Sequence, residues 1–271
     1  MIVPEIQKER ITEYLNEGKR FDGRKPEEHR EIEVELGLSK NAEASCSLKL
    51  GKTEVYVGVK LGLAEPYPDS QDEGTFMTSA ELSPMASEDF ELGPPKINSI
   101  ELARIIDRGI RESGFLDFKK LCIKEGEKVW QVFLDIIAIN DDGNLLDAAA
   151  LASLIALGNA KLPVYNEKED RIEHELSKEP LPVNKEAMAF NMTFHKIGNE
   201  IIVDASKEEE EISEFRLSIA VADNKGKPRI TAMQKGKEAS ISEEDMEKIL
   251  SLVELKFKEM MPKVNKFVWG K

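Results

Sequence analysis

The sequence predicts an α/β protein of the α+β type, built from two β-rich halves with packed helices. Runs of apolar, β-branched residues open each half, and a helical pattern follows them. This order occurs twice in 271 residues, which predicts a duplicated architecture, although no repeat of fixed period is visible. We expect a single domain over residues 1–271, with an N-terminal helix within 1–19, a first half at 20–160, a connecting loop region at 161–186 and a second half at 187–271.

The composition is that of a globular protein with a strongly acidic balance. Fifty-two acidic residues against 38 basic ones give a net charge of −14, which argues against nucleic-acid binding over the whole surface. The chain has no run of 18 apolar residues and no apolar signal segment at its start, so we expect a cytoplasmic protein without a membrane partner. Cys46 and Cys122 form no C-x-x-C pair, and His29, His174 and His195 lie far apart. The sequence therefore predicts neither a metal site nor a catalytic histidine.

The first half begins with a helix expected over residues 4–18, with a proline near its start and a glycine at its end. Three strand-like runs follow, and the two-residue turn Gly51-Lys52 joins the last two as a hairpin. These runs are residues 32–38, 44–50 and 53–61. Residues 64–74 are polar, and we expect them to form a loop.

A helix expected over residues 98–113 has an apolar side and a basic side. The basic side carries Arg104, Arg108 and Arg111, at i, i+4 and i+7. Three parallel guanidinium groups on one helix face are suited to contact RNA phosphates. The alternative is that Glu101 and Glu112, which share this side, pair with the arginines as ordinary surface ion pairs.

A strand, a tight turn and a buried helix follow in immediate succession. The strand is expected over residues 129–139, and Asp141-Asp142-Gly143 supplies the turn. Asn144 then occupies the N-cap position, and Asp147 is favourable near the positive end of the helix dipole. The helix, expected over residues 145–157, is almost entirely apolar and must be covered on several sides. Such a corner is a natural anion site, but its first helical residues include no Arg, Lys, Ser or Thr.

The second half is expected to contain four strands and a long terminal helix. The strands are residues 188–195, 201–204, 214–222 and 229–233. The helix starts near a capping Ser240 or Ser242 and carries one apolar face. The polar segment 165–182 before this half is expected to loop over the surface.

Four short motifs occur along the chain, and their occurrence in this order is more specific than any one of them alone. They are Arg20-Phe21-Asp22-Gly23-Arg24, the hairpin Ala44–Val55, the corner Asp141–Leu145 and the closing turn Gln234–Glu238. Together they resemble the phosphorolytic exoribonucleases of the RNase PH family. In that family the corner reads Asp-Gly-Gly-Ser/Thr-Arg, and its hydroxyl and arginine hold inorganic phosphate. Here these two positions carry Asn144 and Leu145, so the resemblance implies a degenerate phosphate corner. The first motif is expected to be structural, with Asp22 and the arginines bridging segments.

Active members of that family carry two further acids in the second half, one of which supports phosphorolysis. Counted without gaps from Asp204, these positions fall on Glu210 and Arg216. An arginine stays protonated near neutral pH and cannot act as a general acid. The resemblance thus implies a degenerate catalytic acid position at Arg216 and no catalytic residue in this chain. The acidic run Glu208–Glu211 is interpreted as a solvated loop.

The chain resembles, within this family, the non-catalytic RNase PH-like subunits of the archaeal exosome core. The resemblance implies a hexameric ring in which such a subunit alternates with a catalytic RNase PH-like partner that degrades single-stranded RNA from the 3′ end. In such a ring the partner uses the inorganic phosphate, RNA-binding cap proteins admit the RNA, and the non-catalytic subunit needs no cofactor. The same resemblance implies that Arg104, Arg108 and Arg111 contribute to the RNA path.

Two alternatives to this interpretation remain open at the level of sequence. The chain could itself be an active phosphorolytic exoribonuclease, with Asp204 and Glu210 replacing the usual acid and an arginine from elsewhere replacing the one missing at Leu145. It could also be a purely structural subunit that never contacts RNA.

Overall fold

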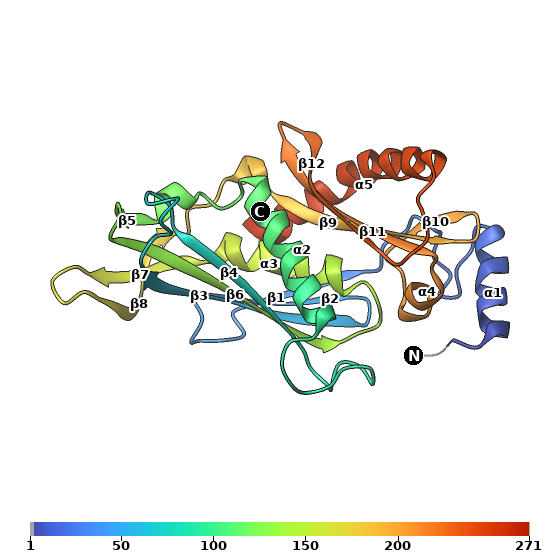
Figure 1. Cartoon of the computed structure of the whole chain (residues 1–271), viewed down its shortest axis with the longest axis horizontal. Coiled ribbons are helices and arrows are strands. Elements are labelled where there is room, and N and C mark those ends of the chain that lie inside the picture. Colours follow the sequence, from blue (N-terminus) through green and yellow to red (C-terminus); the bar gives the residue numbers. More distant parts are fainter. Residues whose placement is uncertain (1–2, 271) are drawn as a thin grey trace.

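Each half of the chain forms one β-sheet, and two helices lie between the sheets (Figure 1). The structure is a computed structural model that describes residues 3–270, apart from the side chain of His174, so the prediction for that histidine lies outside the described part. The elements of the first half are α1 (Glu5–Asn16), β1 (Ile32–Leu36), β2 (Ala44–Leu50), β3 (Thr53–Ala64), β4 (Thr75–Leu82), α2 (Ile97–Ser113), β5 (Cys122–Lys124), β6 (Lys128–Asn140) and α3 (Leu145–Asn159).

The rest of the chain forms a hairpin and then the second half. The hairpin consists of β7 (Lys161–Asn166) and β8 (Arg171–Pro180). The second half consists of β9 (Ala189–Ile197), β10 (Glu200–Val203), α4 (Lys207–Ile212), β11 (Phe215–Asn224), β12 (Lys227–Gly236) and α5 (Glu243–Trp269). Along residues 3–270, even α5 lacks a continuous apolar stretch that could span a bilayer.

The two sheets differ in how their strands are connected. The first has the order β1-β2-β3-β6-β4, with β5 paired to β6, and only the β4–β6 pair is parallel. The second is antiparallel throughout, in the order β10-β9-β11-β12. Burial alternates along β3, where every second side chain from Thr53 to Leu61 faces the interior. This period of two is what a strand with one buried face requires.

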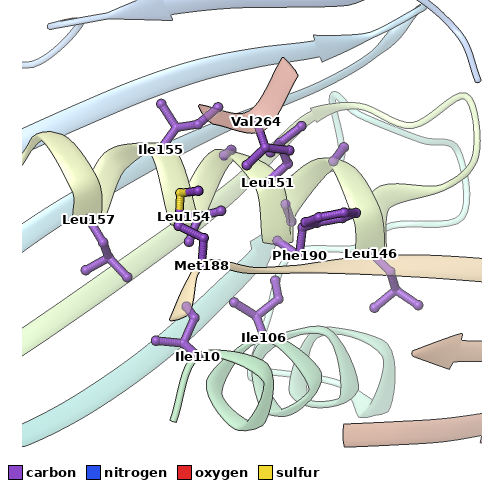
Figure 2. Packing of buried hydrophobic residues seen from close by; sticks show 14 of the residues in the cluster. Ile106, Ile110, Leu146, Leu151, Leu154, Ile155, Leu157, Met188, Phe190 and Val264 are labelled. Carbon is purple, nitrogen blue, oxygen red and sulfur yellow. The ribbon is translucent and has the colours of Figure 1, made fainter. Parts of the chain in front are cut away.

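Helix α3 forms the centre of the core. It packs against β2 and β3 on one side and against β9 and α5 on the other. Figure 2 shows side chains of α2, α3, β9 and α5 meeting in one apolar cluster, with Leu154 and Ile155 on different sides of α3. Both side chains are fully buried. The prediction that this helix must be covered on several sides is confirmed. Because the helix is held in the core, its first residue has a fixed position beside the turn at residues 141–144.

The expected loop at residues 161–186 is wrong, because β7 and β8 form a two-stranded sheet there. The charged residues concealed the strand pattern, but Tyr165 of β7 packs edge-on against Trp130 of β6 and anchors the hairpin. Strands β4 and β5 also lack a counterpart in the sequence prediction. Short strands such as β5 acquire their conformation from the neighbour they pair with rather than from their own residues.

The acidic run at residues 208–211 is likewise not a solvated loop, because it forms the short helix α4. Ser206 accepts a hydrogen bond from the Glu209 N–H, and the Glu209 carboxylate accepts one from the Ser206 N–H. This reciprocal capping box explains why the helix begins where it does. Glu209 is buried, and the backbone after it carries Glu210 toward the corner.

Candidate functional site

The corner between β6 and α3 forms the floor of the candidate site. Asn144 is the N-cap residue, as predicted, but it lies in the left-handed region with φ of 59° and its side chain makes no cap hydrogen bond. Its Nδ2 instead donates to Asp204 Oδ1 at 2.9 Å. Its backbone N–H, at the positive end of α3, donates to Glu210 Oε1 at 2.8 Å. A carboxylate of the same chain therefore binds the N–H that a helix start offers to an anion.

A buried ion-pair centre, formed by Asp204 with Arg24 and Arg30, holds the corner in place. Asp204 is fully buried, and its carboxylate accepts hydrogen bonds from Arg30 Nη2 at 2.7 Å and Arg24 Nη1 at 2.9 Å. Arg30 also donates to the carbonyl oxygens of Asp142 and Gly143, both at 3.0 Å. Burial raises the pKa of Asp204, but its hydrogen bonds and ion pair with Arg30 outweigh this and lower the pKa to about 2.

The predicted structural role of the motif at residues 20–24 is consistent with these contacts. Arg20 is buried and donates to the Glu209 carboxylate through two nitrogen atoms. Arg24 donates to Asp22 Oδ2 at 2.7 Å in addition to its bond with Asp204. The motif thus joins the N-terminal segment to α4 and to the end of β10.

A cavity of about 490 Å³ opens above the corner. It is lined by residues from the corner, α2, α4, β9, β11 and β12, among them Leu145, Leu146, Glu101, His195, Lys207, Glu210, Arg216 and Lys237. Of the three degenerate positions predicted from the sequence, Leu145 and Arg216 line it, whereas Asn144 is not among its lining residues. Arg216 Nη2 donates to Glu101 Oε1 at 2.5 Å, and Lys207 pairs with Asp141.

Lys237 is also engaged within the cavity. Its amino group donates to the carbonyl oxygens of Glu210, Glu211 and Ser213. Burial lowers its pKa, and the nearby charge of Arg216 acts in the same direction. Each of the three cations, Lys207, Arg216 and Lys237, is therefore already bound to groups of this chain.

His195 and Glu210 face each other across the cavity floor. Ser213 Oγ donates to the Glu210 carbonyl at 2.8 Å, so it accepts from His195 Nδ1–H at 3.1 Å. This assignment leaves His195 Nε2 as an acceptor without a partner among the described residues, 3.8 Å from Glu210 Oε1. Burial lowers the pKa of His195 to about 3 and raises the pKa of Glu210 to about 7. The pair is accordingly a neutral histidine beside a carboxyl that is readily protonated.

Asp147 stabilises the junction between the halves, although the sequence suggested an interaction with the helix dipole. It is buried, and its two oxygens accept from the Thr193 N–H at 3.0 Å and the Thr193 hydroxyl at 2.7 Å. Burial raises its pKa to about 7, in spite of the hydrogen bonds from Thr193. A side chain that belongs to α3 thus holds β9 of the second half.

The raised pKa of Asp147 predicts a specific pH dependence of stability. The Asp147 carboxyl keeps its proton up to about pH 7 in the folded chain but releases it near pH 4 in the unfolded chain. Its contribution to the free energy of unfolding is therefore fully present below pH 4 and is lost as the pH rises to 7. In Asp147→Asn, the side-chain oxygen can accept from the Thr193 N–H and the amide can donate to the Thr193 hydroxyl. The free energy of unfolding of this variant should therefore improve relative to wild type by about 3 to 4 kcal/mol over this window. Urea denaturation at pH 4.5 and pH 8 measures the difference. The exposed Asp69→Asn is the control, and a pH-independent difference for Asp147→Asn contradicts the prediction.

The three arginines predicted on one helix face are divided by the structure. Arg104 and Arg108 are exposed and line a groove of about 360 Å³ between α2 and β12. Within residues 3–270, neither of them has a hydrogen bond or ion pair. The alternative of ordinary ion pairs is not realised for them, because Glu101 pairs with Arg216 instead.

Arg111 is directed away from that groove. Its guanidinium lies over the rings of Phe76 and Phe118, with 5.7 and 5.4 Å between its carbon and the ring centroids. It also donates to the Phe76 carbonyl at 3.0 Å and pairs with Asp107. The expected set of three parallel guanidinium groups is wrong in this respect, because the aromatic rings and Asp107 bind the third one against β4.

Several site residues were not predicted from the sequence. Arg30 is isolated in the sequence, and no motif indicates its role. Lys207 and Lys237 line the cavity only because α4 and the end of β12 meet there. Glu209 could have been found, since Ser206-x-x-Glu209 is a capping-box pattern.

Comparisons with known proteins identify the family. The 3′ exoribonuclease family, domain 1, matches residues 28–163, and domain 2 of the same family matches residues 187–252. The chain is similar to the exosome complex component Rrp42 of Methanothermobacter thermautotrophicus, with 44% identity over 98% of this chain and 96% of that protein. It is also similar to Rrp42 of Pyrococcus horikoshii, with 45% identity over 95% of this chain and 92% of that protein.

Solved structures agree with the sequence relatives. A chain of the Archaeoglobus fulgidus exosome with RNA bound to the active site matches with a TM-score of 0.84 and 42% identity, over 95% of this chain and 98% of that chain. A chain of an archaeal exosome core matches with a TM-score of 0.81 and 38% identity, over 97% of this chain and 96% of that chain. The predicted RNase PH-like fold is thereby confirmed, and the chain belongs to the RNase PH, or 3′ exoribonuclease, family.

Proposed function

We propose that this chain is a non-catalytic, RNA-binding and structural subunit of a hexameric exosome core ring. In this ring it alternates with a catalytic RNase PH-like partner, which degrades single-stranded RNA from the 3′ end and uses inorganic phosphate. The chain itself uses no cofactor, and RNA-binding cap proteins deliver the RNA. The names of its relatives support membership of an exosome, since they are exosome components of similar length.

The observation that carries the non-catalytic role is the state of the corner cavity. Leu145 occupies the position where the family resemblance calls for a phosphate-binding arginine, and an alkyl side chain offers phosphate no hydrogen bond. Arg216 occupies the position of an acid and pairs with Glu101. Since phosphorolysis needs bound phosphate and an acid at the position that Arg216 occupies, neither requirement has its family side chain here.

Arg104 and Arg108 support a role in binding RNA. They are exposed cations on successive turns of α2, free of internal partners within residues 3–270, and they lie beside apolar side chains such as Ile100 and Met233. Arginine binds phosphate through two parallel hydrogen bonds, and apolar neighbours provide surface for a base or ribose. In a protein with net charge −14, such a local site is where an RNA strand would find favourable electrostatics.

The rival proposal, an active exoribonuclease, has less support. Asp204 is fully buried and bound to Arg24 and Arg30, so it cannot reach a substrate. Glu210 has a raised pKa suited to proton transfer, but its carboxylate is bound to the Asn144 N–H. The other rival, a subunit without RNA contact, leaves the unpaired Arg104 and Arg108 without a role.

Phosphorolysis by reconstituted mixtures tests the proposal. We expect the purified chain alone to release no nucleoside diphosphate from a 3′-tailed RNA in the presence of phosphate. Mixed with the catalytic partner, it should raise the rate above that of the partner alone. Phosphate-dependent release by the chain alone would instead favour the first rival and lead to a search for an active site near Glu210. A mixture that is no faster than the partner alone would contradict the subunit role.

A further inference from the structure

We propose that the carboxylate of Glu210 is a built-in occupant of the anion position at the corner, and that it keeps inorganic phosphate out of this subunit. The contact is an autoinhibitory one, made within a single chain. It goes beyond the proposed function, because the leucine at position 145 removes one phosphate ligand but leaves the Asn144 N–H and the cations of the cavity in place.

The geometry places a carboxylate where an external anion would bind. Asn144 N–H lies at the start of α3, a helix of 15 residues, and it donates to Glu210 Oε1 at 2.8 Å. A helix of this length presents partial positive charge and free N–H groups at its start. Such groups bind phosphate and carboxylate by the same hydrogen bonds, so the two compete for one position.

His195 marks the same position independently of the helix. Its side chain is 1% exposed and lines the cavity, and its Nε2 has no hydrogen-bond partner among the described residues. Because Nδ1 is bound to Ser213, the free nitrogen faces Glu210 Oε1 at 3.8 Å. A buried polar atom without a partner is uncommon in folded proteins and indicates a position where a polar group can bind. The protonated form of Glu210 can donate to it.

Charged groups of both signs surround Glu210, and they come from several elements. Lys207 and Glu211 come from α4 itself, Asp141 from the corner, Arg216 from β11 and Lys237 from the position directly after β12. Two of the three cations are bound to carboxylates, namely Lys207 to Asp141 and Arg216 to Glu101 of α2. The third, Lys237, binds only carbonyl oxygens. Removing Glu210 would therefore leave the Asn144 N–H at the start of α3 open, beside the cations that line the cavity.

Glu210 is held in this position by its own helix. The capping box of Ser206 and Glu209 fixes the start of α4, and Arg20 binds the Glu209 carboxylate. Lys237 binds the carbonyl oxygens of Glu210 and Glu211 at its end. A carboxylate fixed this close to the N–H competes as an intramolecular ligand, at an effective concentration of millimolar or more. The cavity of about 490 Å³ leaves room for a small anion, so occupancy rather than size excludes phosphate.

Thermal unfolding of the full-length chain in sodium phosphate tests the inference. The phosphate concentration is varied from zero to about 50 mM, and sodium chloride keeps the ionic strength constant because surface charges respond to salt. Wild type should show no phosphate-dependent change in Tm. In Glu210→Ala, phosphate should raise the Tm by about 2 to 4 °C, because a ligand that binds only the folded state stabilises it. Glu210→Gln keeps an oxygen that can accept from Asn144 N–H, so its response should stay below that of the alanine variant.

A matched control and the failure cases make the outcome decisive. Glu208→Ala removes another acid of α4, whose side chain lines a different cavity, and should gain no response to phosphate. A phosphate response in wild type, or none in a folded Glu210→Ala, overturns the inference. If Glu210→Ala does not fold without phosphate, refolding in phosphate but not in chloride supports the inference, and failure in both overturns it. These measurements contain no RNA and no partner subunit, so their outcome is separate from that of the proposed function.

Discussion

Replacing Asp204 with alanine should lower the free energy of unfolding by roughly 3 to 5 kcal/mol. Asp204 is fully buried, and its carboxylate is the common acceptor for Arg24, Arg30 and Asn144. Without it, two largely buried guanidinium groups lose the charge that compensates their removal from water. The loss should spread through the fold, since these three donors belong to the N-terminal segment and to the corner before α3.

Urea denaturation at pH 7 measures this loss, and a pH series identifies its cause. The pKa of Asp204 in the folded chain is about 2, below the ordinary value of 3.8. Its contribution is therefore present above about pH 4 and is lost as the pH falls toward 2, so wild type and Asp204→Ala should converge in acid. Glu91→Ala, which breaks the exposed pair with Lys96, is the control and should leave the stability nearly unchanged. A similar small loss in both variants would contradict the structural importance of this centre.

Much of the fold could be predicted because its signals are local. The helix at residues 145–157 is apolar on every side, and only a position at the centre of the protein accommodates such a sequence. Valines and leucines alternate in β3, so its register needs no tertiary information. The hairpin β7–β8 was missed because its residues are mostly polar and its position depends on tertiary contacts with β6, among them Tyr165 with Trp130 and Asp170 with Lys128.

The candidate site could be predicted less completely, because its chemistry depends on contacts between distant segments. The positions of Leu145 and Arg216 followed from strings of residues, and both do line one cavity. Glu210 was assigned to a solvated loop, since four consecutive acids have no preferred direction until a capping box and Arg20 orient them. Arg111 has the same spacing as a phosphate-binding residue, and nothing in the sequence around it indicates that Phe76 and Phe118 lie beneath it.

Of the three arginines on α2, Arg104 and Arg108 line the groove and Arg111 does not, so we expect a large effect on RNA affinity only from the first two. The double variant Arg104→Ala, Arg108→Ala should reduce the RNA affinity of the assembled ring by about 100-fold, because each hydrogen bond between charged groups contributes on the order of a factor of ten. Each phosphate contact of a single strand contributes about 0.7 to the slope of log affinity against log salt, so the slope should become shallower by about 1.4. Filter binding or fluorescence anisotropy over a salt series, with a short single-stranded RNA, measures both quantities.

Arg111→Ala is the control that distinguishes the structure from the sequence pattern, because it removes an equal charge from the same helix. The Arg111 guanidinium already binds Asp107 and the Phe76 carbonyl, so its loss should lower the stability of the subunit while the RNA affinity and salt slope of the folded ring stay near wild type. An equal loss of affinity in Arg111→Ala would mean that all three arginines act on RNA, and that Arg111 leaves its aromatic site to do so. The exposed and unpaired Arg104 and Arg108 are the cations of this helix most available to a phosphate. Unchanged affinity in the double variant would therefore mean that α2 does not contact RNA, and it would favour a subunit that supports its partner by contact alone.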